Sequence, residues 1–213
     1  MNYVERVQRQ SLGLQIASVL RKSILVGQIS SGEHLAEPLL AETFGTSRAP
    51  VREALSLMIR EGFAIRERNG RVIVTAMTFR DIEDLYETRL LIEKHAIRRA
   101  VEKAVPKSVI AEMKNVLEGP IAASDFAERD VDFHELIVQL AENKFLVQSW
   151  RNTKDIFRTI IEITDNSKPL TLVHDEHKSI VSLIEHGDFD AALDLLTTHV
   201  GTGIQVMKTI ISR

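Results

Sequence analysis

The sequence contains no cysteine and no long apolar run. Without cysteine the chain can form neither a disulfide framework nor a thiolate metal site, which leaves His, Asp and Glu as its strong metal ligands. It has no run of about eighteen apolar residues and no secretory signal pattern. We therefore expect a cytoplasmic protein without a membrane partner.

Charge is distributed unevenly along the chain. Up to Thr75 there are ten Lys and Arg against seven Asp and Glu, whereas the remainder carries 17 against 23, for a formal net charge of −3. A hydrophobic content of 44% allows cores to be buried. The basic front end on an acidic body suggests a polyanionic partner for the N-terminal part alone.

The first third of the chain has the pattern of a winged helix-turn-helix. Apolar spacing ended by glycine predicts three helices: 11–26, 38–44, and one from the cap Ser47 to the stop Gly62. A hairpin is predicted from two short strands, 65–68 and 71–74. Asn69-Gly70 between them is a strong turn signal. Two short helices followed by such a wing predict a DNA-binding domain over 1–76.

The rest of the chain, 77–213, has helical patterns only. Thr78 and Asp81 form a capping box that begins a helix ending at about Ala104. Further helices are predicted between glycine, proline and asparagine breaks at Gly119-Pro120, Asn143, Pro169 and Gly187: 106–118, 124–142, 144–165, 169–186 and 188–211. The short connections imply an antiparallel all-α bundle, so the fold class is mainly α.

Basic side chains gather on the predicted DNA-reading elements. The apolar face of the third helix leaves Arg48, Ala49 and Arg52 outward, where a helix-turn-helix approaches base edges. Thr46 and Ser47 suit a phosphate at the helix N-terminus. The wing adds three arginines suited to the backbone or the minor groove: Arg66, Arg68 and Arg71. A merely solvated surface is the alternative, but five converging arginines favour double-stranded DNA.

The stretch from Gly27 to Val74, and above all the segment SRAPVREAL, resembles the GntR family of bacterial regulators. The resemblance implies operator contacts on the third helix and at the wing tip: Ser47, Arg48, Ala49, Arg52, Arg68, Asn69 and Gly70. It also agrees with our expectation of a homodimer on an inverted-repeat operator, because a two-fold protein matches palindromic half-sites.

Polar side chains interrupt the apolar faces of three bundle helices. Asp130 lies one turn before His134, and His177 and His199 lie on later helices. A carboxylate on an apolar stripe needs a cation or another partner. These residues suit a divalent transition metal: zinc above all, or nickel, manganese or iron. A buried polar cluster without metal is the alternative.

The remaining histidines have ordinary explanations. His34 is expected in a loop, His95 among charged residues, and His186 at a helix C-terminus where positive charge is favoured. His174 lies near the start of its helix and is expected to be exposed rather than a ligand.

The segments DVDFH and EHKSI and the region of His199 resemble the FCD effector domain of FadR-like regulators. The resemblance implies the same four ligands: Asp130, His134, His177 and His199. It further implies dimerisation and a small carboxylate or sugar acid as effector. Arg89, on the inward stripe of the first bundle helix, would bind that acid, or it would pair structurally with Glu93.

Two rival functions remain at this stage. His134-Glu135 begins like the HExxH motif of metal-dependent hydrolases, but Val138 stands where the second histidine is needed. The other rival is a constitutive DNA-binding dimer with a purely structural metal. Residue patterns do not separate this rival from a sensor, because both need the same folds.

Overall fold

The structure, a computed structural model, describes residues 11–75, 77–102, 105–119, 122–164 and 169–211. The chain divides into two compact units, one ending at Met77 and the other beginning at Thr78. Within the described residues no helix is both long enough and apolar enough to cross a bilayer.

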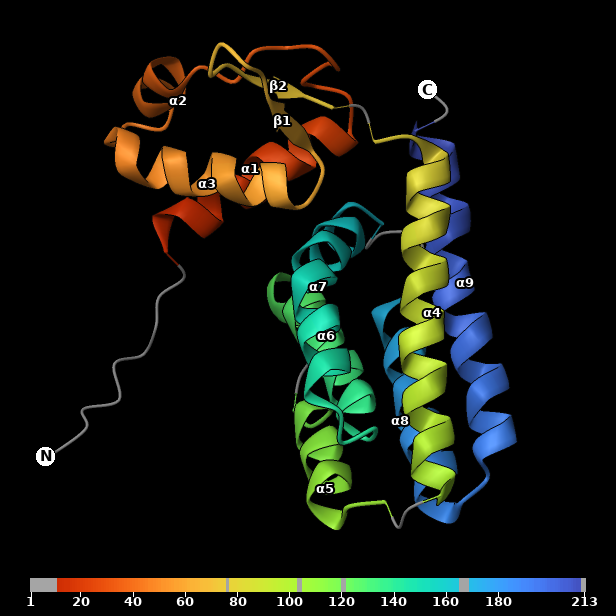
Figure 1. Ribbon diagram of the computed structural model, residues 1–213. Coiled ribbons are helices and arrows are strands. Elements are labelled where there is room, and N and C mark those ends of the chain that lie inside the picture. The colour runs from red at the N-terminus through yellow and green to blue at the C-terminus, as the bar shows by residue number, and fades with distance from the viewer. Residues whose placement is uncertain (1–10, 76, 103–104, 120–121, 165–168, 212–213) are drawn as a thin grey trace, which may run out of the picture. The chain divides into compact units, whose positions relative to one another are not determined.

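The N-terminal unit is built on α1 (Leu12–Leu25) and α3 (Arg48–Arg60), with the short α2 (Glu37–Thr43) completing the helix-turn-helix (Figure 1). Ser11 caps α1, its hydroxyl accepting a hydrogen bond from Leu14 N at 3.2 Å. Apolar side chains of α1 and α3 are buried together: Ile16, Leu20, Ile24, Val51, Ala54, Leu55 and Met58. The three predicted helices are confirmed, with ends shifted by about one residue.

The wing is a two-stranded antiparallel sheet of β1 (Ala64–Arg66) and β2 (Val72–Val74). The loop after α1 adds to its edge, where His34 forms an isolated bridge with Ile73. The expected hairpin is therefore present, and His34 is tied to it rather than lying in a free loop.

The strands are shorter at the turn than the predicted 65–68 and 71–74. Glu67 N donates to Arg71 O at 2.8 Å, and Gly70 N donates to Glu67 O at 2.9 Å, which closes a longer loop. Gly70 adopts φ +86°, a conformation that favours glycine. Residues near the turn that the alternating pattern assigns to the strands thus belong to the loop that closes the hairpin.

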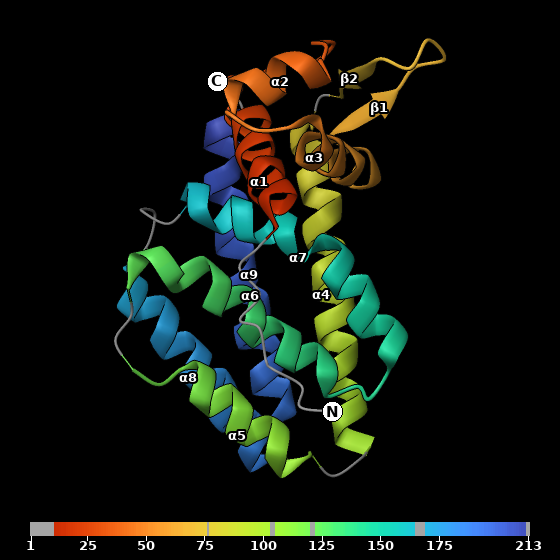
Figure 2. The ribbon, with the colours of Figure 1, turned by 90° about the vertical axis from the view of Figure 1, so that its left-hand side faces the viewer.

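The C-terminal unit consists of helices α4 (Phe79–Glu102), α5 (Lys107–Val116), α6 (Ala123–Gln139), α7 (Lys144–Thr164), α8 (Leu170–His186) and α9 (Phe189–Ile211). Helix α4 packs against α9 along much of its length (Figure 1), and α5 lies beside α8 (Figure 2). The predicted capping box is present, because Thr78 and Asp81 exchange backbone-to-side-chain hydrogen bonds.

Some predicted helix ends differ from the structure or lie outside the described residues. Ala104, Pro120 and Asp165 are not among the described residues. Helix α6 ends at Gln139, earlier than the predicted residue 142, and Glu142 adopts a left-handed φ of +48°. The helix pattern continues past this end because residues 140 and 141 are buried like the helix before them.

The middle of the bundle contains a layer of buried polar side chains. The core around it is apolar, and its large buried rings Trp150, Phe133 and Phe157 contact the layer directly. In the layer, each of the following side chains is less than a tenth exposed: Arg89, Glu93, Asp130, His134, His177 and His199. This layer contains the candidate site.

Candidate metal centre and nucleic-acid interface

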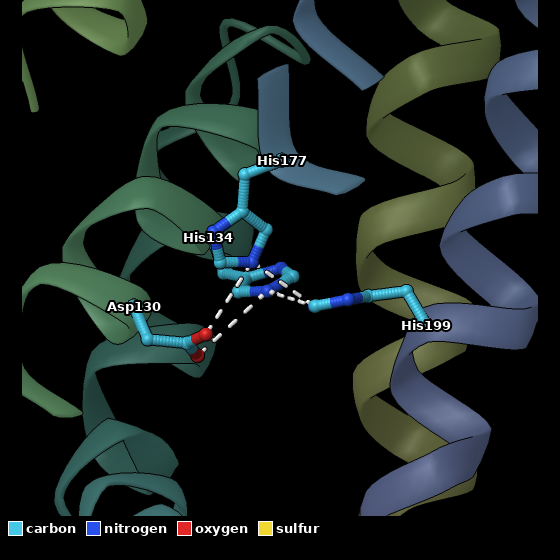
Figure 3. Close-up of side chains that lie close together, drawn as sticks. All are labelled: Asp130, His134, His177 and His199. Carbon is cyan, nitrogen blue, oxygen red and sulfur yellow. Dashed lines mark hydrogen bonds and ion pairs between the residues drawn. The ribbon is translucent and has the colours of Figure 1, made fainter. Parts of the chain in front are cut away.

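The structure brings together the four residues predicted as metal ligands. Helix α6 contributes Asp130 and His134, α8 contributes His177, and α9 contributes His199. One potential ligand atom of each lies within 4.8 Å of the others. In Figure 3 the carboxylate and the three imidazole rings point toward one another. Three helices thus supply one compact set of nitrogen and oxygen donors from residues up to 69 positions apart in the sequence.

Two carboxylates outside this set orient two of the imidazoles. Glu93 Oε2 lies 2.5 Å from His134 Nδ1, and Glu176 Oε2 lies 2.9 Å from His199 Nδ1. When each Nδ1 donates its proton to a carboxylate, the Nε2 atom presents a lone pair to the cluster. The Nε2 atom of His199 lies 3.2 Å from that of His134 and 3.0 Å from that of His177.

These distances indicate a site that suits a cation. Lone pairs that face one another repel unless a proton or a metal ion lies between them. Burial, the largest cause, lowers the pKa of His134 and of His177 well below the usual value, so both rings are neutral at neutral pH. Neutral imidazoles and a carboxylate are the donor set of a divalent transition metal, and the residues present therefore fit such an ion.

Arg89 is a buried neighbour of the cluster. Its Nε donates to Glu93 Oε1 at 2.8 Å, and its Nη2 lies 3.9 Å from Asp130 Oδ2. Burial disfavours its charge, but Glu93 and Asp130 outweigh that effect and raise the pKa of Arg89. The predicted structural pairing with Glu93 is therefore present. It satisfies Glu93 and leaves the charge of Asp130 only partly compensated.

A cavity of about 80 Å³ adjoins the cluster. Asp130 and His199 line it together with Arg89, Tyr86 and Gly203. Apolar walls with a few convergent polar groups are typical of small-molecule sites. Arg89, assigned to effector binding from the sequence, thus borders the same space as two of the four candidate ligands.

The third helix presents the predicted DNA-reading residues to solvent. Arg48, Ala49 and Arg52 are exposed, and the face opposite them is buried. Ser47 occupies the N-cap position of α3, but its side chain makes no capping hydrogen bond. Thr46 is half-buried, and its N–H donates to Ala41 O at 2.9 Å.

The basic side chains of this surface have partners of different kinds. The Arg52 guanidinium lies 3.3 Å from Glu37 Oε2 at the start of α2. In the wing, Arg66 Nη1 donates to Gly70 O at 3.2 Å, while Arg68 and Asn69 are exposed. The structure thus places Arg48, Ala49 and Arg52 on the exposed side of α3, Thr46 and Ser47 just before that helix, and the remaining predicted contact residues on the wing.

One histidine prediction is wrong, and several polar roles were missed. His174 is only 9% exposed, because it lies three residues before His177 on the inward face of α8; it is not among the four clustered residues. The roles of Glu93 and Glu176 in orienting imidazoles were not predicted. Glu93 has a weak signal, one turn after Arg89 on the inward face. Glu176 has none.

The two units together define a class of protein. A winged helix-turn-helix with a basic exposed face is a DNA reader, and a helical bundle whose largely apolar cavity is bordered by a few convergent polar groups is a ligand-binding module. One chain that contains both is organised as a DNA-binding transcription regulator.

Family models agree with this class. The model described as bacterial regulatory proteins, gntR family, matches residues 12–74, and the FCD domain model matches residues 84–202. The chain belongs to the GntR family and carries an FCD domain. FCD domains are associated with metal binding and with small-molecule effectors, and GntR regulators bind DNA operators.

Named relatives and a solved structure extend the comparison. The gluconate operon transcriptional repressor of Bacillus licheniformis is 30% identical over 89% of this chain and 82% of its own length. The galactonate operon transcriptional repressor of Escherichia coli K12 is 28% identical over 92% of this chain and 96% of its own. A GntR-family regulator from Pseudomonas syringae pv. tomato DC3000 shares the fold, with a TM-score of 0.56 at 24% identity, covering 96% of this chain and 89% of that one.

Proposed function

We propose that this protein is a transcriptional repressor whose affinity for its operator is controlled by a small carboxylate bound in the FCD domain. One observation carries the proposal: Arg89, Asp130 and His199 line a single cavity. A guanidinium and a cation site that border one cavity form a two-point trap for an anion.

The proposed metal site is the set Asp130, His134, His177 and His199. A divalent ion bound there, with zinc favoured, would supply a positive anchor for a carboxylate oxygen. The charges support this assignment, because Glu93 already neutralises Arg89 whereas Asp130 is 3.9 Å from it. A divalent ion and Asp130 together retain one positive charge, which the carboxylate of an effector would balance.

Arg89 is the proposed effector-binding residue of the chain. Its guanidinium has five N–H donors, and toward the residues that the structure describes only Nε donates a hydrogen bond, to Glu93. The terminal nitrogens therefore retain donors for an acid in the adjoining cavity. The operons named for two relatives concern gluconate and galactonate, which are sugar acids, and this supports an acid as the effector class.

The proposed DNA contacts combine base reading with backbone positioning. Arg48, Ala49 and Arg52 would face base edges, and Thr46 and Ser47 a phosphate. The wing residues would contact the backbone or the minor groove: Arg66, Arg68, Asn69 and Gly70. Their exposure supports these roles.

A homodimer on an inverted repeat is part of the proposal. The bundle leaves large apolar side chains exposed, among them Leu91 on α4 at 65% and Phe145 at the start of α7 at 73%. Burial of such side chains against a second copy would stabilise a dimer. A two-fold dimer would then match two half-sites of one operator.

Effector binding alters operator affinity only if the ligand prefers one arrangement of the protein over another. Helix α4 is the proposed link, because it contains Arg89 and begins at Phe79, five residues after β2 ends. A ligand that repositions Arg89 acts on the helix that directly follows the wing in sequence.

The test uses the full-length protein and an operator selected from a random DNA library. We expect a small carboxylate such as gluconate to weaken operator binding by wild type. Arg89→Ala should lose this response but keep its metal content and effector-free operator affinity. Arg98→Ala, an exposed arginine on the same helix, is the matched control. Operator binding that no acid alters would instead support the constitutive dimer with a structural metal.

A further inference from the structure

The Tyr86 hydroxyl is a polar group that the cluster and Arg89 do not account for. Tyr86 is 2% exposed and lines the cavity beside Arg89. No hydrogen bond joins its hydroxyl to any residue that the structure describes. The hydroxyl is not among the buried atoms that lack a partner, because Tyr86 lines the cavity, where water or a ligand can meet it. Phenylalanine would keep the ring packing but would present no hydrogen-bonding group to the cavity. Tyr86 therefore supplies the cavity with a hydrogen-bonding group that neither the cluster nor Arg89 uses.

The surroundings of Tyr86 hold its ring firmly. The ring packs edge-on against Phe157, with centroids 5.6 Å apart, and the Arg89 guanidinium carbon lies 5.9 Å from the ring centroid. Tyr86 lies three residues before Arg89, on the same face of α4. The hydroxyl is thus a preorganised group at a fixed place next to the proposed anion site.

Gly203 on α9 leaves the space that the hydroxyl occupies. A Cβ atom on Gly203 would lie 2.8 Å from Tyr86 Oη, closer than real Cβ atoms come to other atoms. Gly203 lies within a helix, where glycine is unfavourable compared with alanine. Both residues line the cavity, so the glycine and the tyrosine together shape one polar wall of it.

We infer that Tyr86 is a specificity-determining residue that hydrogen-bonds a second oxygen of the effector, most simply a hydroxyl group of a hydroxy acid. This inference rests on the proposed function, in which the carboxylate lies at the cluster and Arg89. Burial raises the pKa of Tyr86 to about 12, so its hydroxyl keeps its proton and can donate. An acid without the second oxygen would leave this hydroxyl unpaired and would bind more weakly.

The inference is tested with full-length, metal-loaded protein and four matched acids: butyrate and 2-, 3- and 4-hydroxybutyrate. By isothermal titration calorimetry, at least one hydroxy acid should bind wild type about tenfold more tightly than butyrate. Tyr86→Phe removes only the hydroxyl. Tyr86→Phe should bind the hydroxy acid and butyrate with about equal affinity, and its affinity for butyrate should differ from that of wild type by less than about twofold.

Gly203→Ala is a second variant, because its new methyl group displaces the same hydroxyl and should also reduce the preference. Circular dichroism and metal content should match wild type in both variants. A preference for the hydroxy acid that persists in Tyr86→Phe overturns the inference, as does wild type that binds butyrate as tightly as every hydroxy acid. If wild type binds none of the four acids, the inference fails, and if in addition no acid alters operator binding, the proposed function fails as well.

Discussion

Arginine and glutamate pair in both units of this protein, but the pairs differ in exposure. The side chains of Arg52 and Glu37 are 64% and 25% exposed, whereas those of Arg89 and Glu93 are 4% and 0% exposed. Water makes an exposed pair worth about 0–1 kcal/mol, while removal of one partner from a buried pair costs about 3–5 kcal/mol. A surface arginine can therefore exchange its partner for DNA, and a buried one is held in place.

The pair of Arg21 and Glu61 tests whether burial, rather than the unit in which a pair lies, determines the stability lost when one partner is removed. It joins α1 to the end of α3 at 2.8 Å, with side chains 1% and 3% exposed. Arg21→Met should lower the free energy of unfolding by about 3–5 kcal/mol in urea denaturation, because Glu61 loses its charge partner. Adding Glu61→Leu should recover part of the loss. If Arg21→Met is as stable as wild type, burial does not determine the stability lost when one partner is removed.

Metal removal tests the buried cluster as a whole. We expect about one divalent ion per chain, since four donors should retain it. An ion at a hundredfold excess over its Kd stabilises the folded state by about 2.7 kcal/mol. His134→Ala, and likewise His199→Ala, should lower metal content in elemental analysis and also the Tm. His95→Ala, on the exposed face of α4, should change neither. If wild type contains no bound metal after loading, the four residues form a buried polar cluster and not a metal site.

Arg52 tests the exposed side of the comparison. Arg52→Ala should weaken operator binding by about 1–3 kcal/mol through the loss of its contact with one base pair, and it should weaken the preference for a particular base at that position. The measurement is a titration against operators changed one base pair at a time. Arg60→Ala, an exposed arginine at the end of the same helix, should keep the preference. Unchanged affinity and preference in Arg52→Ala would remove Arg52 from base reading.

The smallest effect is expected at the exposed capping box of α4. Hydrogen bonds from the Thr78 side chain and backbone hold the pKa of Asp81 below its ordinary value of 3.8. A lowered carboxylate pKa contributes stability above pH 3.8, and this stability is lost as the pH falls through the folded-state pKa. Thr78→Ala should therefore cost about 1 kcal/mol at neutral pH and less in acid. An NMR titration should show a higher Asp81 pKa in Thr78→Ala than in wild type. If Thr78→Ala lowers the free energy of unfolding equally at neutral and at acidic pH, this account is wrong.

Several features of this protein follow from its sequence alone. Apolar periodicity, glycine stops and capping residues predict the helices because they act within a few residues. The wing and the outward face of α3 follow in the same way, and so does the inward position of Asp130, one turn before His134. Each of these is a local property, and its errors are confined to element ends such as that of α6.

Other features depended on tertiary packing. Periodicity placed His177 and His199 on inward faces, but only the folded bundle brings their Nε2 atoms to 3.0 Å from each other. Glu176 orients His199 across two helices, which no spacing along one helix reveals. Tyr86 belongs to an ordinary apolar stripe until Gly203, 117 positions later in the sequence, leaves room for its hydroxyl. Local patterns decide which face a side chain occupies, whereas long-range packing decides which atoms it meets there.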